Sequence, residues 1–290
     1  MAPELQDESC AVTILITTRD RAGHLARTLN TLSQIDHPRA LSEEILVVDN
    51  GSRDNTPDLL KGWSSPGNSR RFIVEPRPGQ SCARNTGVAN ARGEIILFTD
   101  DDVIPGRTWI EGMSAPITGG RAEIVVGPVE LAPCLVRGWM TPRLRRRLAC
   151  RDASELRGEP AGANLAIARG WIQKVGGFDE ALGPGQLGFC DETLLMRRCM
   201  QMGARMAYAG KEALVTHWPA EERLLRSAWI EDAVKLGRSA AYMNHHYRMK
   251  ECHARFPKLV YSYLRFVGRQ LRHPRASRQR EGIDEREWNA

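Results

Sequence analysis

The 290-residue sequence lacks the features that mark several large classes of protein. Its seven cysteines form no Cys-x-x-Cys pair, so we expect neither a disulfide framework nor a structural zinc site. No apolar run approaches the roughly 20 residues of a membrane-spanning helix. The first residues are acidic, and no apolar core of a signal peptide follows them. Together these absences predict a cytoplasmic protein with reduced thiols.

Aromatic residues are also scarce, at 6% of the chain, which leaves few platforms on which nucleic-acid bases could stack. Neither G-x-G-x-x-G nor G-x-x-x-x-G-K-[ST] occurs, so a dinucleotide site or a P-loop has little support. The formal net charge of +6 includes basic clusters at 143–147 and 265–280. A solvated charged face is the simpler explanation of these clusters, and contact with the inner face of an anionic membrane is the alternative.

What is present is an alternation of strand-like apolar runs and helical patterns. This order predicts an α/β fold with a Rossmann-like, doubly wound, mostly parallel sheet and helices on both faces. A further helical pattern continues from residue 223 to about residue 272. The strands are predicted near 12–16, 44–48, 71–74, 95–98 and 123–129, and the helices at 22–34, from 56, at 81–91 and at 105–113.

The strand at 95–98 is followed by three consecutive carboxylates, Asp100, Asp101 and Asp102. Three like charges side by side repel one another, so a cation is needed to make the arrangement tolerable. Carboxylate oxygens are hard ligands, which favours Mg²⁺ or Mn²⁺ bridged to a phosphate group. The alternative is a solvated turn in which one aspartate caps a helix that begins near Pro105.

Other polar motifs lie at the predicted carboxyl ends of strands, where parallel sheets bind ligands. Thr17–Arg21 follows the first strand. Asp49 follows the second strand, where it either accepts hydrogen bonds from a nucleobase or ribose or belongs to an ordinary turn. Arg84 lies near the start of a predicted helix, where it suits a diphosphate or the edge of a base; a solvated surface arginine is the alternative.

Two more candidates lie in the second half of the chain. Asp191 and Glu192 open a predicted helix after a Gly-rich loop, where either a general base or ordinary first-turn acids are expected. His217 follows a short strand-like run, and it is either a metal ligand or a structural histidine.

Six short segments of the chain, most of them containing the candidate residues above, appear in the order in which a known family has them. With them the chain resembles the family 2 glycosyltransferases, inverting enzymes with a GT-A fold, over about residues 11–218. Each motif is weakly specific alone, and their order makes the resemblance strong. The segments are Ile14–Arg21, Val47–Asp54, Gly79–Gly87, Thr99–Asp102, Gly176–Glu180 and Asp191–Glu192.

The resemblance implies a role for each candidate residue. Asp191 would be the catalytic base, although a register with Glu192 as the base stays open because Cys190 replaces the family's usual Glu. Asp102 would bind a divalent metal, Mn²⁺ or Mg²⁺, with His217 as a further ligand. Contacts with the nucleotide sugar are expected from Thr17, Arg19, Asp49, Arg84, Asp100 and Asp101.

The resemblance also implies the activity. We expect a metal-dependent inverting glycosyltransferase that uses a nucleoside-diphosphate sugar, most often a UDP-sugar; the acceptor is open among small molecules, glycans, lipids and peptides. We expect a nucleotide-sugar-binding and catalytic domain at 11–218, a C-terminal helical extension at 219–275 that is a candidate for dimerisation, and a polar tail at 276–290. The alternatives are a non-catalytic nucleotide-binding protein and a nucleotidyltransferase, which is disfavoured because Thr17–Arg21 contains no glycine. No nucleic-acid partner is expected.

Overall fold

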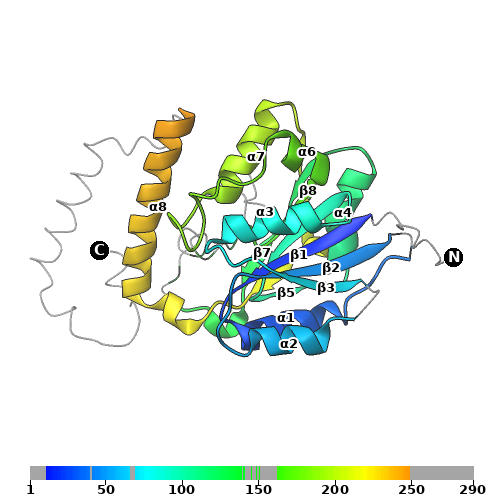
Figure 1. Ribbon diagram of the computed structural model, residues 1–290, viewed down its shortest axis with the longest axis horizontal. Coiled ribbons are helices and arrows are strands. Elements are labelled where there is room, and N and C mark those ends of the chain that lie inside the picture. Colours follow the sequence, from blue (N-terminus) through cyan, green and yellow to red (C-terminus); the bar gives the residue numbers. More distant parts are fainter. Residues whose placement is uncertain are drawn as a thin grey trace, which may run out of the picture.

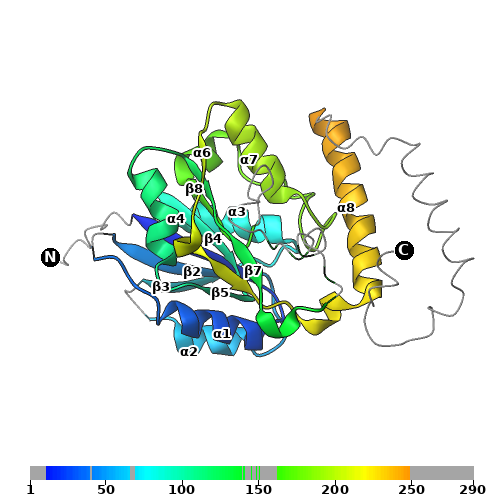
Figure 2. The ribbon, with the colours of Figure 1, turned by 180° about the vertical axis from the view of Figure 1, so that it is seen from behind.

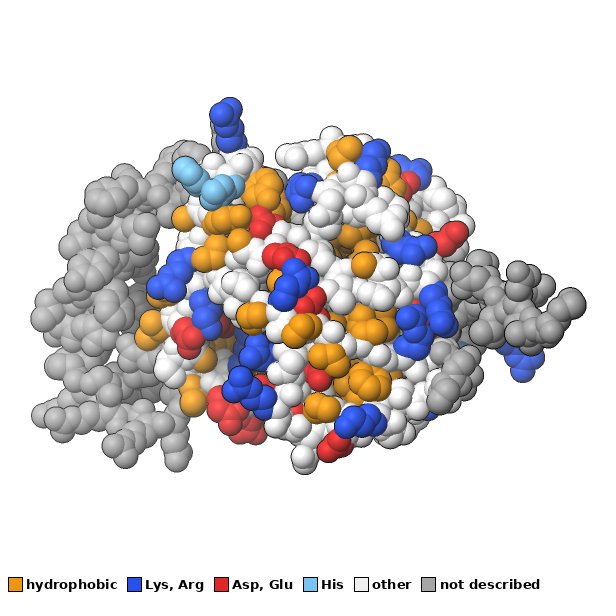
Figure 3. Space-filling model, viewed as in Figure 1, with side chains coloured by type: hydrophobic (Ala, Val, Ile, Leu, Met, Phe, Trp, Pro, Cys, Tyr) orange, Lys and Arg blue, Asp and Glu red, His pale blue; other side chains and the backbone are white. Residues whose placement is uncertain are grey.

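The computed structural model describes residues 11–39, 41–65, 69–138, 140, 145, 148, 150 and 162–248. The predicted tail at 276–290 and the basic cluster at 265–280 lie outside these residues, as does most of the cluster at 143–147. Within the described part of the chain, no helix is both long and apolar enough to cross a membrane. On the face shown in Figure 3, acidic and basic side chains are interspersed with apolar ones.

A seven-stranded sheet forms the centre of the fold (Figure 1). Its strands are β1 (Val12–Thr18), β2 (Glu43–Asp49), β3 (Arg70–Val74), β4 (Ile95–Asp100), β6 (Ile124–Val126), β8 (Leu165–Ala168) and β9 (Met206–Tyr208). They lie in the order β3-β2-β1-β4-β8-β6-β9. β1 is parallel to β2 and β4, and β2 is parallel to β3, whereas β8 is antiparallel to β4 and β6. The prediction of a mostly parallel sheet is confirmed.

Helices cover both faces of this sheet, as Figures 1 and 2 show. Ile14 and Ile16 of β1 belong to a core that includes residues of α1 and α4, whereas Leu15 belongs to a second core with residues of α3, α6 and α7. Because side chains alternate along a strand, one apolar run supplies both cores. The helices are α1 (Ala22–Leu32), α2 (Thr56–Trp63), α3 (Gln80–Asn90), α4 (Trp109–Thr118), α6 (Arg169–Lys174) and α7 (Asp191–Gln201).

A smaller sheet corrects two predicted boundaries. It has three strands in the order β5 (Val103–Pro105), β10 (Val215–His217) and β7 (Val129–Leu131). The helix predicted from Pro105 begins only at Trp109, because β5 pairs with β10 first; a proline is tolerated there since β5 is an edge strand. The single strand predicted at 123–129 is divided at Gly127, where a Cβ atom would lie 2.2 Å from the side chain of Asn164. The chain leaves the large sheet at this point and joins the small one.

The last described helix, α8 (Arg226–Tyr247), lies beside the sheet, next to the loop that precedes α7 (Figures 1 and 2). A 3-10 turn at Glu221–Leu224 leads into it. The helical pattern predicted from residue 223 is thus confirmed up to Tyr247, and its remainder to residue 272 lies outside the described residues. Trp229, Ser239 and Met243 of α8 are buried.

Candidate active site

The polar motifs converge because three parallel strands end together. In the register of the sheet, Thr18 lies opposite Asp49, and Thr17 lies opposite Asp100. The carboxyl ends of β1, β2 and β4 are therefore adjacent, which is where a doubly wound sheet binds its ligands. The motifs at Thr17–Arg21, Asp49 and Asp100–Asp102 accordingly share one edge of the sheet.

The three consecutive aspartates have different partners. Asp101 is buried and accepts a hydrogen bond from Thr18 Oγ1 at 2.7 Å. Asp102 is also buried and pairs with Arg21 Nη2 at 2.6 Å and with His217 Nε2 at 3.3 Å. Burial raises the pKa of Asp101 to about 7, although Arg21 opposes this rise. Burial would also raise the pKa of Asp102, but hydrogen bonds and charges from His217 and Arg21 hold that pKa well below its usual range.

His217 reaches Asp102 because of the small sheet. It lies opposite Val103 in the pairing of β10 with β5, and the next amide, of Trp218, donates to the carbonyl of Asp102 at 2.7 Å. The Nδ1 atom of His217 lies 2.7 Å from the carbonyl oxygen of Leu148. A carbonyl only accepts, so Nδ1 carries a hydrogen and Nε2 faces Asp102. Burial lowers the pKa of His217, but Asp102 and Cys150 outweigh it and raise that pKa to about 10.

The geometry of the Asp102–His217 pair fits a divalent metal ion, which would replace the proton that the raised pKa keeps on His217 Nε2. The two facing atoms, Asp102 Oδ1 and His217 Nε2, are 3.3 Å apart, close to the roughly 3 Å that separates neighbouring ligands of one ion bound at about 2.1 Å. The Nδ1–H bond to a backbone carbonyl is the usual support of a metal-binding histidine. Among the described residues, His, Cys, Asp and Glu side chains form no metal-binding group of three or more. Oxygen atoms of a bound phosphate and of water would complete the coordination shell.

Arg84 of α3 joins the carboxylates on the other side of the site. It is only 3% exposed, and its Nη1 atom lies 2.5 Å from Asp191 Oδ2 and 2.8 Å from Glu192 Oε1. Its Nη2 atom lies 3.5 Å from Asp100 Oδ1. One buried guanidinium thus serves three carboxylates. In this structure Arg84 faces those carboxylates, and its predicted contact with a nucleotide stays a prediction.

The two candidate bases differ in burial and in proton affinity. Asp191 is 1% exposed, and burial, together with the charge of Glu192, raises its pKa to about 8 against the opposing charge of Arg84. The Glu192 side chain is 19% exposed. Burial would raise the pKa of Glu192, but Arg84 and the hydrogen bond with Asp191 lower it. The two carboxyls therefore share Arg84, and their pKa values differ because that of Asp191 is raised and that of Glu192 is lowered. Acid–base pairs of known enzymes show the same separation of pKa values.

The other predicted site residues lie at or near the same edge. Thr17 Oγ1 accepts a hydrogen bond from Gln80 Nε2 at 3.2 Å. Asp49 is buried, and its Oδ1 accepts a hydrogen bond from the Ser52 amide at 2.9 Å. The Arg19 side chain is 45% exposed, and its Nε lies 3.7 Å from Asp20. Arg19 is therefore the candidate with the most freedom to move.

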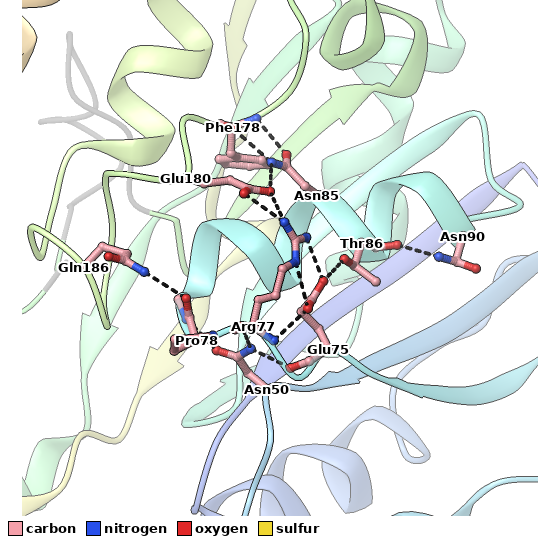
Figure 4. A network of polar contacts seen from close by, with 11 residues as sticks. Asn50, Glu75, Arg77, Pro78, Asn85, Thr86, Asn90, Phe178, Glu180 and Gln186 are labelled. Atoms are coloured by element: carbon pink, nitrogen blue, oxygen red, sulfur yellow. Dashed lines mark hydrogen bonds and ion pairs between the residues drawn. The ribbon is translucent and has the colours of Figure 1, made fainter.

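A polar network holds the turn before α3 (Figure 4). The Asn50 side chain donates to the carbonyls of Glu75 at 2.9 Å and Arg77 at 2.7 Å, and accepts from the Gly79 amide at 3.0 Å. Arg77 forms ion pairs with Glu75 at 2.9 Å and with Glu180 at 3.0 Å. The end of β2, the start of α3 and the loop before α7 are joined in this way.

Three residues of the site were not predicted individually: Thr18, Arg21 and Gln80. Thr18 and Arg21 bind the aspartates, and Gln80 Nε2 lies 3.2 Å from Thr17 and 3.4 Å from Asp100. Thr18 and Arg21 lie inside the strand-end motif at 17–21, and Gln80 lies inside the segment 79–87; these positions were the only signal in the sequence. Which polar residue of a turn points inward depends on the tertiary structure.

Comparisons with known proteins bear on the family and the fold. The model of glycosyl transferase family 2 matches residues 13–178, more than half of the chain. Over 120 residues the chain is 32% identical to glycosyltransferase AglE of Haloferax volcanii, a match that covers 41% of this chain and 39% of that protein. Over 239 residues it is 28% identical to the pre-mycofactocin glycosyltransferase of Mycobacterium tuberculosis, covering 79% of this chain and 47% of that protein. The chain thus spans less than half the length of these relatives.

Among solved structures, the fold is similar to that of the mannosyltransferase PcManGT from Pyrobaculum calidifontis, determined in complex with GDP-Man and Mn²⁺. The TM-score is 0.63 at 22% sequence identity, and the match covers 81% of this chain and 64% of that chain. At this identity the likeness shows that the fold is shared, which agrees with the predicted GT-A architecture.

Proposed function

Because the chain belongs to glycosyl transferase family 2, we propose that it moves a sugar from a nucleoside-diphosphate sugar, in the first place a UDP-sugar, to an acceptor with inversion at the anomeric carbon. One observation carries this proposal. The Asp102–His217 pair and the cluster of Arg84, Asp191 and Glu192 are joined through the Asp100–Asp102 segment at the ligand-binding edge of the sheet. A metal-diphosphate site and a base are then adjacent, as the transfer requires.

The nucleotide would occupy the ends of β1 and β2. Thr17 and Asp49 offer oxygen atoms that accept hydrogen bonds there, and the exposed Arg19 supplies a positive charge. Asn50, through its bonds to the turn before α3, fixes the wall of this part of the site. Residues 11–218 would constitute the nucleotide-sugar-binding and catalytic domain.

The diphosphate would lie at Asp100–Asp102. Asp102 Oδ1 and His217 Nε2 would hold a divalent ion, Mn²⁺ or Mg²⁺, which supplies positive charge beside the leaving group. Arg21 neutralises part of the charge on Asp102, and Thr18 orients Asp101. These supporting contacts fix the carboxylates before any substrate binds, which limits reorganisation during the reaction.

Asp191 is the proposed base that takes the proton of the acceptor nucleophile. Its raised pKa makes it the more basic of the two neighbouring carboxyls. Arg84 compensates charge on Asp191 before the reaction and can stabilise the leaving diphosphate, since it also reaches Asp100. Glu192 is the second candidate, because its side chain is more exposed to an incoming acceptor.

Thermal-shift measurements with a panel of nucleotide sugars test the donor side of this proposal. A UDP-sugar with Mn²⁺ should raise the melting temperature, because a ligand present at 100 times its Kd stabilises the folded state by about 2.7 kcal/mol. GDP-mannose and UDP-sugars without metal are the comparison arms. Release of UDP from the matched donor would then be followed with and without candidate acceptors. A panel in which no nucleotide sugar shifts the melting temperature would overturn the proposed function.

A further inference from the structure

The loop of residues 179–190, which leads into α7, is held from two sides. On its inner side it contacts the start of α3. Ser81 Oγ donates to the carbonyl of Leu182 at 2.8 Å, and the Gln80 amide donates to the carbonyl of Pro184 at 2.9 Å. On its outer side lies α8, which Figures 1 and 2 show beside this loop.

Helix α8 forms hydrogen bonds with both ends of the loop. At the first end, the hydroxyls of Tyr242 and Tyr247 donate to the same oxygen, Asp179 Oδ2, at 3.1 and 2.6 Å. At the second end, the Phe189 amide donates to Ser239 Oγ at 3.1 Å, and Ser239 is fully buried. A carboxylate that accepts two hydroxyl hydrogen bonds is a strong anchor, because hydrogen bonds to charged groups are stronger than those between neutral groups.

Apolar contacts and close packing fill the space between these bonds. Met243 of α8 forms a buried cluster with Leu182 and Leu194. Gly188 has a φ of +114°, and a Cβ atom there would lie 2.7 Å from Lys235 Cβ. The loop therefore approaches α8 so closely that a glycine is required at this position.

The position of the loop determines the position of the candidate base. Phe189, which is bound to Ser239, is followed by Cys190 in a left-handed conformation (φ 73°) and then by Asp191. On the inner side, a Cβ atom at Gly183 would lie 3.0 Å from Asp191 Cγ, so the loop backbone lies directly against this carboxyl. A displacement of the loop would move Asp191.

We propose that Tyr242, Tyr247 and Ser239 of α8 are positioning residues for the transfer reaction. They fix the loop ends at Asp179 and Phe189 and thereby hold Asp191 and Glu192 in place. Helix α8 is then a working part of the catalytic unit, and the boundary at residue 218 separates two segments that function together. These contacts lie beyond the 13–178 segment that matches the family model. This inference rests on the proposed function for its effect on catalysis, but the hold on the loop is independent of it.

The test uses the double variant Tyr242→Phe/Tyr247→Phe in the full chain, which removes both hydroxyls and keeps both rings. Tyr208→Phe on β9, an exposed tyrosine, is the matched control. Hydrogen–deuterium exchange of residues 179–190 measures the hold on the loop. Turnover of the nucleotide sugar that the thermal-shift panel identifies gives kcat and KM. The thermal shift caused by UDP with Mn²⁺ shows whether the nucleotide site is intact.

In the double variant we expect hydrogen–deuterium exchange of residues 179–190 to be at least tenfold faster. We expect kcat to be about tenfold lower, a loss equivalent to about 1.4 kcal/mol. The donor KM and the UDP–Mn²⁺ shift should stay at control values. Because the tyrosines act through Asp179, adding their substitutions to Asp179→Asn should lower kcat no further than Asp179→Asn alone. Ser239→Ala should likewise speed exchange near Phe189.

Unchanged loop exchange in the double variant would overturn the inference, and so would faster exchange with unchanged kcat. A lower melting temperature with wild-type kcat per folded molecule would assign the tyrosines to stability alone, which also overturns it. If the wild-type protein turns over no nucleotide sugar, the proposed function has failed, and the inferred role in the reaction falls with it. Exchange alone then decides whether α8 holds the loop.

Discussion

Removal of Arg84 is the perturbation whose effect on stability follows most directly from the structure. Arg84→Gln keeps a polar side chain of similar length but removes the buried positive charge. Its three carboxylate partners, Asp100, Asp191 and Glu192, would then face one another without compensation. Arg84 is 3% exposed, so water cannot replace the lost guanidinium without opening the site.

The magnitude follows from the cost of an uncompensated buried charge. Breaking a buried ion pair by removing one partner costs about 3–5 kcal/mol. A domain of roughly this size loses about 2–4 °C of melting temperature per kcal/mol. Arg84→Gln should therefore lower the melting temperature by about 6–20 °C near neutral pH.

The loss should depend on pH in a defined direction. The pKa of Asp191 is raised from 3.8 to about 8 in the folded chain. A carboxyl with a raised pKa contributes its full stability below its unfolded pKa and loses that contribution as the pH rises through the folded value. Without Arg84, which lowers this pKa, the folded pKa rises further and the loss above pH 8 becomes larger. The gap between wild type and variant should be nearly constant from pH 5 to 7, where Asp191 is protonated in both folded chains, and should widen as the pH rises through 8.

Differential scanning fluorimetry across this pH range measures the effect. Arg107→Gln is the control, because Arg107 also pairs with an aspartate, Asp36 at 2.9 Å, but its side chain is 80% exposed. Water and salt screen such an exposed pair, so its loss should be small and nearly independent of pH. An Arg84→Gln variant as stable as the Arg107→Gln variant, or one whose deficit did not change with pH, would refute the reasoning.

Three further predictions concern the metal, the base and acid stability. His217→Ala should abolish the thermal stabilisation that Mn²⁺ adds in the presence of UDP, because one of two proposed protein ligands is lost; a wild-type shift would contradict the metal assignment. Asp191→Asn should lower turnover by about 10²–10⁴-fold with donor KM little changed; if Glu192→Gln has this effect and Asp191→Asn does not, the base is Glu192. The pKa of Glu75 is lowered from 4.5 to about 2 by hydrogen bonds from Arg77 and Thr86, against burial. Its contribution to stability is therefore present above pH 4.5 and lost as the pH falls toward 2. Urea unfolding at several pH values across that range should show the free energy of unfolding of the wild type falling toward that of Glu75→Gln. A difference between the two free energies that stays constant with pH would disprove this role.

The strand-end motifs were predictable because they depend on local pattern and on one general property of parallel sheets. Apolar runs at β1, β2 and β4 specify strands, and parallel strands end at a common edge. The errors at Pro105 and at 123–129 had a different origin. Val103–Pro105 and Val129–Leu131 become strands only because they pair with Val215–His217, whose residues lie 86 to 114 positions further along the chain than their partners. Local propensity contains no information about such a partner.

The sequence by itself determined the α/β class, the order of the large sheet's first four strands and their helices, and the segments that meet at the site, since these follow from periodicity and turn chemistry. Only the tertiary structure decided how the charges pair. It brought Arg84 to Asp191, 107 positions away, set His217 against Asp102, and placed two tyrosines of α8 on Asp179. These pairings depend on how helices and loops pack around the sheet. A side chain's partner, burial and pKa are consequences of that packing, which no local pattern encodes.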